Sequence, residues 1–426
     1  MKLINISGRG ATSSRGAQGK LDELFARRNQ SYERALPVAQ RIVSAVRKGG
    51  DAALHRYATR LDQIPSQLPL RISPDELSAA WAEAPAGLKD ALQTAARNIR
   101  AFAKRQLPKE WSFAPVPGLS VGQIIRPLDA VGCYVPGGRY PLPSTLLMTV
   151  IPAQVAGVPR IAVTSPRPAP ETLAAAAMLG VTECYHIGGA HAIAALAYGT
   201  ESITAVDKIV GPGNVYVTAA KKLVAFDCAI DMLAGPTEIV VTSDNGDPQW
   251  IAADLVAQAE HDPDALAIFV TTSATLARSV MAETKKQSRI NPIAREALRS
   301  NGYAIVARSA DEAHGITNRL APEHLTVDTE ADLAWVSNAG SAFVGPCSAQ
   351  PLGDYISGPN HTLPTTGLAR VRGGLSVTDF LKIITVQQYS PEALRKLGPA
   401  AIALAEAEGL HGHAAAIRTR LEAARA

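Results

Sequence analysis

The sequence predicts an α/β protein with two Rossmann-like parallel-sheet domains. Between residues 121 and 241, short apolar strands are each followed by glycine and then by an alanine-rich helix, which is the pattern of repeated strand–helix units. The same alternation continues from Ile239 to Val344. Aromatic residues make up only 5% of the chain while alanine is abundant, and this favours helices packed on sheets over a β-sandwich.

The N-terminal part of the chain predicts helices. From residue 21 to about residue 105, apolar residues recur at spacings of three and four, and Gly49-Gly50 is expected to end the first long run. We assign residues 1–24 to an N-terminal arm. The first Rossmann-like domain is expected to be discontinuous, with residues 25–133 and 239–380, and to contain strands at 239–242, 267–271, 304–307 and 342–344 and a helix at 250–260.

The second Rossmann-like domain is expected at residues 134–238. Strands are predicted at 133–135, 184–187, 209–210 and 232–233, each before a glycine turn, and the turns are 136–138, 188–190, 211–214 and 235–237. In an open parallel sheet such turns lie together at the carboxyl edge, where helix N-termini can face one ligand. No turn completes the GxGxxG dinucleotide motif, so each turn alone is weak evidence for a nucleotide.

Residues 388–426 predict a different, helical tail. Ser390-Pro391 has the form of a helix cap and first turn, Gly398 is expected to stop that helix, and Pro399 to start another. Two short helices cannot bury their apolar faces alone. We therefore expect this tail to pack on another domain or on a partner subunit.

Composition restricts the partners and the compartment. The chain of 426 residues has 42 basic and 38 acidic residues and no basic block, so we expect no nucleic-acid partner. Its 4 cysteines form no CxxC pair, which speaks against a disulfide scaffold or a cysteine zinc site and favours a reducing cytoplasm. Prolines and polar residues interrupt the most apolar stretch, residues 146–163, so no membrane span is expected.

Three segments carry candidate metal ligands. Gln258 and His261 stand three residues apart at the end of a predicted helix, Asp354 follows a glycine, and His411 and His413 lie in the tail. Nitrogen and oxygen ligands without thiolate suit Zn²⁺ or Mn²⁺. A Gln/His pair alone more often lies on the surface without binding a metal. The predicted metal site therefore requires that the other two segments lie close to this pair.

Glu323-His324 is the candidate acid/base pair. Adjacent residues point in different directions and can serve two tasks from one turn: an imidazole can remove an alcohol proton, and a carboxylate can activate water. Two alternatives use other chemistry. A zinc hydrolase would use Glu323 as its general base, and a thiol-dependent aldehyde dehydrogenase would use Cys347, although no base stands near that cysteine in the sequence.

Together these segments closely resemble the histidinol dehydrogenase family. The resemblance covers nearly the whole chain in order. Its most specific blocks are YVPGG at 134–138, GPGN at 211–214, QAEH at 258–261, APEHL at 321–325, GDY at 353–355, GPNH at 358–361 and AEGLHGH at 407–413.

The resemblance implies a cytoplasmic, NAD-linked, zinc-dependent enzyme that oxidises L-histidinol through the aldehyde to L-histidine, the last step of histidine biosynthesis. It implies an intertwined homodimer whose sites are shared between subunits. By likeness to the family, zinc would be bound by Gln258, His261 and Asp354 and by His413 of the other subunit. These four residues, with Thr237, His361 and Glu408, would bind the substrate.

The same resemblance implies the remaining roles. His324 would remove the alcohol proton and Glu323 would activate water. Tyr134, His191 and Asn214 match cofactor-contacting positions. Three departures from the family pattern are visible: His191 replaces a usual glutamine, Thr237 replaces a serine, and Arg139-Tyr140 is a bulky pair at the nucleotide edge.

A rival within the family fold is a dehydrogenase of another small alcohol, such as a sulfonated propanediol. An anionic substrate would require a basic residue near the metal, whereas Glu408 and His361 favour a cation. The sequence therefore favours histidinol as the substrate.

Overall fold

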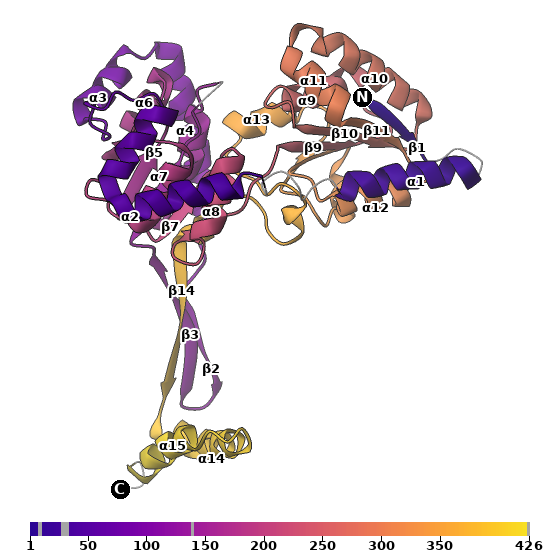
Figure 1. The fold of residues 1–426 in the computed structure, drawn as a ribbon. Coiled ribbons are helices and arrows are strands. Elements are labelled where there is room, and N and C mark those ends of the chain that lie inside the picture. Colours follow the sequence, from indigo (N-terminus) through magenta and orange to yellow (C-terminus); the bar gives the residue numbers. More distant parts are fainter. Residues whose placement is uncertain (7–10, 27–33, 138–139, 424–426) are drawn as a thin grey trace. The chain divides into compact units, whose positions relative to one another are not determined.

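The chain divides into two compact units (Figure 1). The computed structural model describes residues 1–6, 11–26, 34–137 and 140–423. Unit 1 comprises Met1–Gln106 and Asp129–Asp379, and unit 2 comprises Leu107–Leu128 and Phe380–Ala426.

A six-stranded parallel sheet forms one half of unit 1, in the order β1-β11-β10-β9-β12-β13. Its strands are β1 (Lys2–Asn5), β9 (Glu238–Thr242), β10 (Leu266–Thr271), β11 (Gly302–Val306), β12 (His324–Val327) and β13 (Ser341–Val344). Alternate residues of a strand face opposite sides of the sheet, so Ile239 and Val241 join one apolar cluster while Val240 joins another.

Helices cover both faces of this sheet (Figure 1). One cluster includes α9 (Pro248–Ala259), α10 (Ala274–Gln287) and α11 (Pro292–Asn301), and the other includes α1 (Ala11–Ala26) and α12 (Ala310–Leu320). Burial on both sides explains why these strands read as continuous apolar runs rather than as alternating ones.

A five-stranded parallel sheet forms the other half of unit 1, in the order β6-β5-β4-β7-β8. Its strands are β4 (Ala130–Tyr134), β5 (Arg160–Thr164), β6 (Glu183–Tyr185), β7 (Lys208–Val210) and β8 (Ala229–Ile230). One group of helices consists of α2 (Leu36–Leu61), α7 (Gly189–Tyr198) and α8 (Val215–Val224), and a second consists of α3 (Pro74–Glu83), α4 (Ala86–Arg105), α5 (Pro143–Ala156) and α6 (Pro170–Met178).

The two parallel sheets confirm the predicted α/β class, but segments are distributed between them differently from our expectation. Helices α2, α3 and α4, which we grouped with the first domain, pack with the helices of the five-stranded sheet, and β4 belongs to that sheet. Residues of the expected arm form β1 and most of α1 beside the six-stranded sheet. The sequence of an amphipathic helix indicates that one face of the helix is buried, but it does not indicate which sheet covers that face.

Two local expectations also need correction or detail. The strand expected at 232–233 is wrong: β8 ends at Ile230, and Met232 donates its backbone N–H to the Asp231 carboxylate instead of to a neighbouring strand. The break expected at Gly49-Gly50 is a kink, with Gly50 at φ 49° inside α2. L side chains rarely adopt this backbone conformation, whereas glycine adopts it without strain.

Unit 2 contains an antiparallel sheet that we did not predict. Its order is β14-β3-β2, with β2 (Trp111–Val116), β3 (Leu119–Pro127) and β14 (Leu381–Tyr389). The tail is helical as expected, with α14 (Pro391–Ala407) and α15 (His411–Ala423). However, α14 runs through Gly398 and Pro399, because Gly398 lies against Leu421 of α15 and this packing outweighs the weak helix propensity of both residues.

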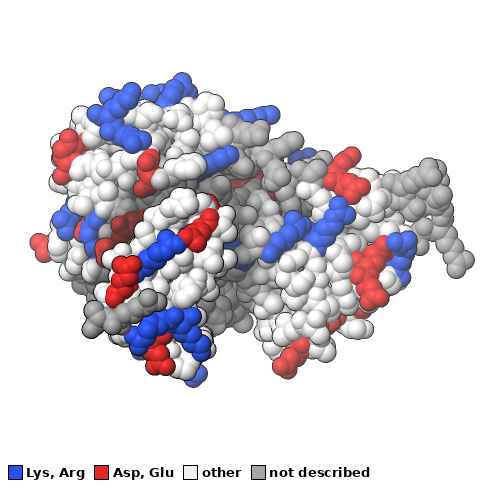
Figure 2. Space-filling model, turned by 90° about the horizontal axis from the view of Figure 1, so that it is seen from below, with Lys and Arg blue, Asp and Glu red and all other residues white. Residues whose placement is uncertain are grey.

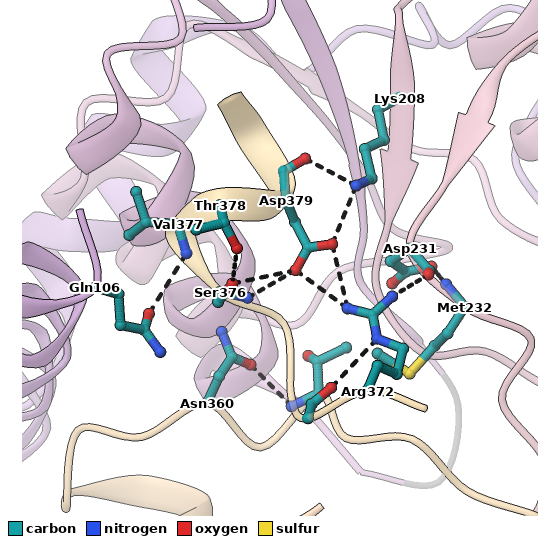
Figure 3. A network of polar contacts seen from close by, with 12 residues as sticks. Gln106, Lys208, Asp231, Met232, Asn360, Arg372, Ser376, Val377, Thr378 and Asp379 are labelled. Carbon is teal, nitrogen blue, oxygen red and sulfur yellow. Dashed lines mark hydrogen bonds and ion pairs between the residues drawn. The ribbon is translucent and has the colours of Figure 1, made fainter. Parts of the chain in front are cut away.

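A polar network holds the segment that ends unit 1 (Figure 3). The Asp379 carboxylate accepts hydrogen bonds from Lys208 Nζ at 3.1 Å, from Arg372 Nη2 at 3.1 Å and from the backbone N–H of Ser376 at 2.9 Å. Arg372 Nη1 also donates to the backbone carbonyl of Asp231. The network therefore ties residues 372–379 to β7 and to the loop after β8.

The remaining elements are short, and the surface carries mixed charge. They are α13 (Gln350–Tyr355) and the 3₁₀ helices Ser288–Ile290, Glu330–Ala334, Leu368–Arg370 and Val377–Phe380.

On the face drawn in Figure 2, basic and acidic side chains are interspersed over an otherwise uncharged surface. Within the described ranges, no helix is long and apolar enough to cross a membrane.

The carboxyl group of Asp254 on α9 makes stability depend on pH. Burial raises its pKa to about 6, and the backbone N–H of Gln350 only partly opposes this shift. Between its ordinary pKa near 4 and the folded value, the native state holds the extra proton, so this group's contribution to stability falls as pH rises through that window.

We therefore expect Asp254→Asn to raise the free energy of unfolding at pH 8 by about 1–3 kcal/mol and to change it little at pH 4. Urea denaturation at the two pH values measures this difference. An equal gain at both pH values would contradict the assignment, and Asp75→Asn on α3, where the side chain is exposed, is the control for a generic loss of charge.

Candidate active site

A cavity of about 180 Å³ in unit 1 brings together the central predicted residues. It lies between the amino ends of β9 and β12 and the loops that follow β7 and β8. Its lining includes Thr237, Gln258, His261, Glu323, His324, Asp354 and His361, together with Gly211 and Asp231. Segments more than a hundred residues apart in the chain thus meet at one place.

One oxygen of the Glu323 carboxylate accepts two hydrogen bonds. Its Oε2 accepts a hydrogen bond from Thr237 Oγ1 at 2.6 Å and one from the backbone N–H of Glu238 at 2.8 Å. Gln258 Nε2 in turn donates to Thr237 Oγ1. Burial raises the pKa of Glu323, against the opposing effect of His324 and of these donors.

His324 is the first residue of β12, and its ring is fixed on one side. Nδ1 lies 3.2 Å from the carbonyl oxygen of Glu238, which can only accept, so Nδ1 carries the proton. Nε2 lies 3.5 Å from Asp354 Oδ1. Burial alone would lower the pKa of His324, but the Glu323 and Asp354 carboxylates outweigh it and raise that pKa, while the His324 ring lowers the pKa of Asp354 against the effect of burial.

The side chains of Glu323 and His324, the candidate acid/base pair, are closer together than the sequence suggested. We expected Glu323 and His324 to point in different directions, yet both line the same cavity and Glu323 Oε2 lies 3.7 Å from His324 Nδ1. Glu323 precedes the strand, so the strict alternation of β-structure does not apply between the two residues.

His361 lines the same cavity as Glu323 and His324. Its Nδ1 donates to the backbone carbonyl of Asp354 at 2.7 Å, and its Nε2 lies 3.3 Å from Thr145 Oγ1 at the start of α5. Burial lowers the pKa of His361. The ring is therefore oriented by one backbone acceptor and keeps its second nitrogen near a hydroxyl.

The candidate metal ligands Gln258, His261 and Asp354 include an oxygen atom that is suited to bind a cation. Gln258 is 1% exposed, and its Oε1 is buried without a hydrogen-bond partner among the residues that the structure describes. Such an orphaned carbonyl oxygen is costly unless a ligand satisfies it. Asp354 Oδ2 is held by Gln350 Nε2 at 2.9 Å, and His261 borders the same cavity.

Histidine, cysteine and carboxylate groups do not by themselves form a metal site in the described part of the chain, where no cluster of three or more has the required arrangement. A site made from Gln258, His261 and Asp354 has only two ligands of those types. Glu408 and His413 belong to unit 2, where both are exposed, and their part in the site stays a prediction.

The predicted cofactor residues line a second cavity of about 430 Å³ at the carboxyl edge of the five-stranded sheet. Tyr134, His191 and Asn214 all border it. The Tyr134 hydroxyl accepts from the backbone N–H of Gly189 at 3.1 Å, and burial raises the pKa of this phenol to about 12. Asn214 caps α8 with its Oδ1, which accepts from the N–H groups of Tyr216 and Val217.

Of the pair Arg139-Tyr140, Arg139 lies outside the described residues. Tyr140 borders a third cavity, of about 540 Å³, together with His261 and Tyr355. Tyr140 therefore lines a cavity with His261, one of the candidate metal ligands, and is not among the residues that line the cofactor cavity.

Sequence reasoning missed several residues that hold these sites. Gln350 supports Asp354, Asp62 contacts His191, and Lys221 pairs with Asp231 below the turn at 211–214. Each residue lies outside the motifs we recognised. Asp62 and His191 are separated by 129 positions, so no local pattern links them.

Comparison with known proteins establishes the family of this chain. The histidinol dehydrogenase family model matches residues 25–421. The chain is 49% identical over 393 residues to the histidinol dehydrogenase of Geobacillus kaustophilus, with 89% of this chain and 92% of that protein covered. The chain belongs to the histidinol dehydrogenase family. It is thus an oxidoreductase, and every site residue assigned above lies within the matched range.

Two further histidinol dehydrogenases extend the comparison. The protein from Methanothermobacter thermautotrophicus is 45% identical over 415 residues, which cover 94% of this chain and 97% of that one. The crystal structure of histidinol dehydrogenase from Elizabethkingia anophelis superimposes with a TM-score of 0.92 at 35% identity, over 100% of this chain and 99% of that chain. The likeness therefore includes both units of the fold.

Proposed function

We propose that this enzyme catalyses the NAD-linked, zinc-dependent oxidation of L-histidinol through L-histidinal to L-histidine, the last step of histidine biosynthesis, in the cytoplasm. The observation that carries this proposal is the meeting of Glu323 and His324 with Gln258, His261 and Asp354 at one cavity in a member of the histidinol dehydrogenase family. The reaction oxidises a carbon atom and later adds water, so it requires an acid/base pair and metal ligands at the same cavity.

Substrate binding would involve the donor set of unit 1. Gln258, His261 and Asp354 would hold zinc together with His413 of the partner subunit. Zinc, when bound, supplies a Lewis-acid anchor for the amine and imidazole nitrogens of histidinol. His361 and Thr237 would contact the substrate in the cavity, and Glu408 of the partner subunit would offer a negative charge to the cationic substrate.

The first oxidation requires a base for the alcohol proton. His324 suits this role because Nδ1–H faces the carbonyl of Glu238, which leaves the Nε2 lone pair to accept that proton. NAD, when bound, supplies the hydride acceptor. Tyr134, His191 and Asn214 at the edge of the five-stranded sheet would orient the cofactor.

The second oxidation starts with hydration of the aldehyde. Glu323 is held through Oε2 by Thr237 and by the Glu238 N–H, so Oε1 remains to take a proton from water as it adds to the carbonyl. His324, protonated in the first oxidation, would return that proton to the carbonyl oxygen as water adds, and would then take a hydroxyl proton of the hydrate as the second hydride leaves. One base thus serves both steps, whereas Glu323 is needed for the second alone.

A homodimer with shared sites is supported by the surface of unit 2. Trp111, Phe113 and Leu404 are 51%, 56% and 67% exposed, and such large apolar side chains gather where a partner covers them. We propose that the partner subunit covers this surface and that the exchange places its His413 and Glu408 at the cavity of unit 1.

The stoichiometry of NADH tests the proposed function. Four-electron oxidation predicts two NADH per histidinol consumed, and L-histidine as the product. Removal of metal by a chelator should abolish turnover and added Zn²⁺ should restore it. One NADH per histidinol, or hydrolysis without NADH, would contradict the proposal.

A variant separates the metal role from general damage. His261→Ala removes one of the four proposed ligands, so zinc bound per subunit should fall along with activity while the far-UV circular dichroism spectrum is kept. His55→Ala on α2 is the matched control and should keep full zinc. Retention of stoichiometric zinc by His261→Ala would place the metal elsewhere.

A further inference from the structure

The side chain of Gln350 makes a buried hydrogen bond to one of the candidate metal ligands. Gln350 is the first residue of α13 and is 0% exposed. Its Nε2 donates to Asp354 Oδ2 at 2.9 Å, four residues further along the helix. The other oxygen of this carboxylate, Oδ1, lies 3.5 Å from His324 Nε2, and both Asp354 and His324 line the cavity of about 180 Å³. The two oxygens of Asp354 therefore have different surroundings.

The carboxylate of Asp354 determines how the Gln350 amide is turned. An ionised carboxylate can only accept, so the NH₂ end of the amide faces Oδ2. The carbonyl end, Oε1, is buried and has no hydrogen-bond partner among the residues that the structure describes. A buried polar atom without a partner costs at least as much free energy as one hydrogen bond gains. The amide therefore adds little net stability, and its contact with Asp354 needs another explanation.

Other contacts hold the backbone of α13 in place. Its first N–H, that of Gln350, hydrogen-bonds to the carboxyl group of Asp254 on α9. Gly353 lies so close to β13 that a Cβ at this position would come within 2.6 Å of the Phe343 ring. These contacts do not involve the Gln350 side chain. Loss of the amide should therefore free the carboxylate of Asp354 to rotate and leave the helix in position.

A neutral donor suits a carboxylate that binds a cation. The Gln350 amide carries no charge, so it fixes one oxygen of Asp354 while the carboxylate keeps its negative charge. A lysine or arginine at this place would pair with that charge and compete with the cation. Hydrogen bonds from outside a metal site orient its ligands, and the loss of such a partner typically weakens metal binding by roughly 10–100-fold.

We propose that Gln350 is a positioning residue for the metal, because it holds Asp354 Oδ2 and so leaves Oδ1 to bind zinc. This inference rests on the proposed function, which takes zinc as the cation and Asp354 as one of its ligands. Gln350 is not among the residues that line the cavity. It acts on the metal through Asp354 alone.

The zinc affinity of the metal-free enzyme tests this role. Zn²⁺ is titrated into the chelator-stripped, full-length enzyme at pH 8, in competition with a chromophoric chelator and without NAD or histidinol. Gln350→Met keeps the length and the helix propensity of the side chain but offers no N–H. The Kd for zinc should therefore rise by roughly 10–100-fold.

Gln154→Met on α5 is the matched control. Gln154 donates to the backbone carbonyl of Leu179 at 2.7 Å, so the substitution also removes an amide hydrogen bond, but Gln154 is not among the residues that line the cavity. This variant should keep the parent Kd. Gln350→Leu also lacks the N–H and should show the same rise as Gln350→Met, and it provides the test if Gln350→Met fails to fold.

A second background separates an effect on Asp354 from a general disturbance of α13. If Gln350 acts through this carboxylate, Gln350→Met should raise the Kd for zinc by less than about threefold in the Asp354→Ala background. An equal fold-change in the two backgrounds, or an unchanged Kd in the parent background, overturns the positioning role. Urea denaturation of each metal-free variant shows whether a higher Kd reflects a loss of folded protein.

The proposed function fails by a different result. If the parent binds one zinc per subunit and yields two NADH per histidinol while Gln350→Met keeps the parent Kd, only the role of Gln350 is wrong. A parent enzyme that binds no zinc overturns both.

Discussion

Glu323→Gln will slow the oxidation of histidinal by roughly 10²–10⁴-fold, the usual cost of losing a general base, and will leave the oxidation of histidinol to the aldehyde near the parent rate. The amide keeps the shape and the contact with the Glu238 N–H but cannot take a proton from water. His324→Asn will slow both oxidations, because an oxygen must lose its proton before each hydride departs.

Single-turnover formation of NADH, started separately with histidinol and with histidinal, measures the two steps. Glu330→Gln changes an exposed glutamate in a 3₁₀ helix of the same unit and should leave both rates unchanged. If Glu323→Gln oxidised histidinal at the parent rate, Glu323 would not be the residue that activates water.

Lys221→Met will lower the free energy of unfolding by about 3–5 kcal/mol, as expected when one partner of a buried ion pair is removed. Lys221 Nζ donates to Asp231 Oδ1 and to the carbonyl of Gly211 at 2.8 Å, and Asp231 Oδ2 accepts the Gly211 N–H at 2.7 Å. The variant leaves the Asp231 carboxylate buried with backbone donors only.

Urea denaturation followed by circular dichroism measures the loss. Lys285→Met, at an exposed position of α10, should change stability by about 0.5 kcal/mol or less. Adding Asp231→Asn to Lys221→Met should recover part of the loss, because the uncompensated charge is then gone. A loss in the double variant equal to the sum of the two single losses would show that the pair does not interact.

Local patterns predicted most of unit 1. Strands such as β9 and β10 and the helices between them follow from apolar runs and glycine turns, which act over about ten residues. The pairing of β3 with β14 joins Leu119–Pro127 to Leu381–Tyr389, and no local pattern indicates a partner at that distance. The same limit explains why α2, α3 and α4 were assigned to the wrong sheet.

The candidate site divides in the same way. Short motifs whose residue types indicate their chemistry contain Gln258, His261, Glu323 and His324. These residues could therefore be identified as candidates from the sequence alone. Gln350 contacts Asp354 through one hydrogen bond, and Asp62 contacts the Gly188 N–H and the His191 ring. Their residue types are common on any helix, and only the fold shows what they touch.

The order of strands in unit 2 has a consequence for synthesis on the ribosome. β3 lies in the middle of its sheet, yet its partner β14 follows after about 250 further residues, which take roughly 10–50 s to translate. During that interval the hairpin of β2 and β3 leaves the edge of β3 that pairs with β14 open, and such an edge can pair with other chains. The nascent enzyme should therefore need chaperone protection until Tyr389 has left the exit tunnel.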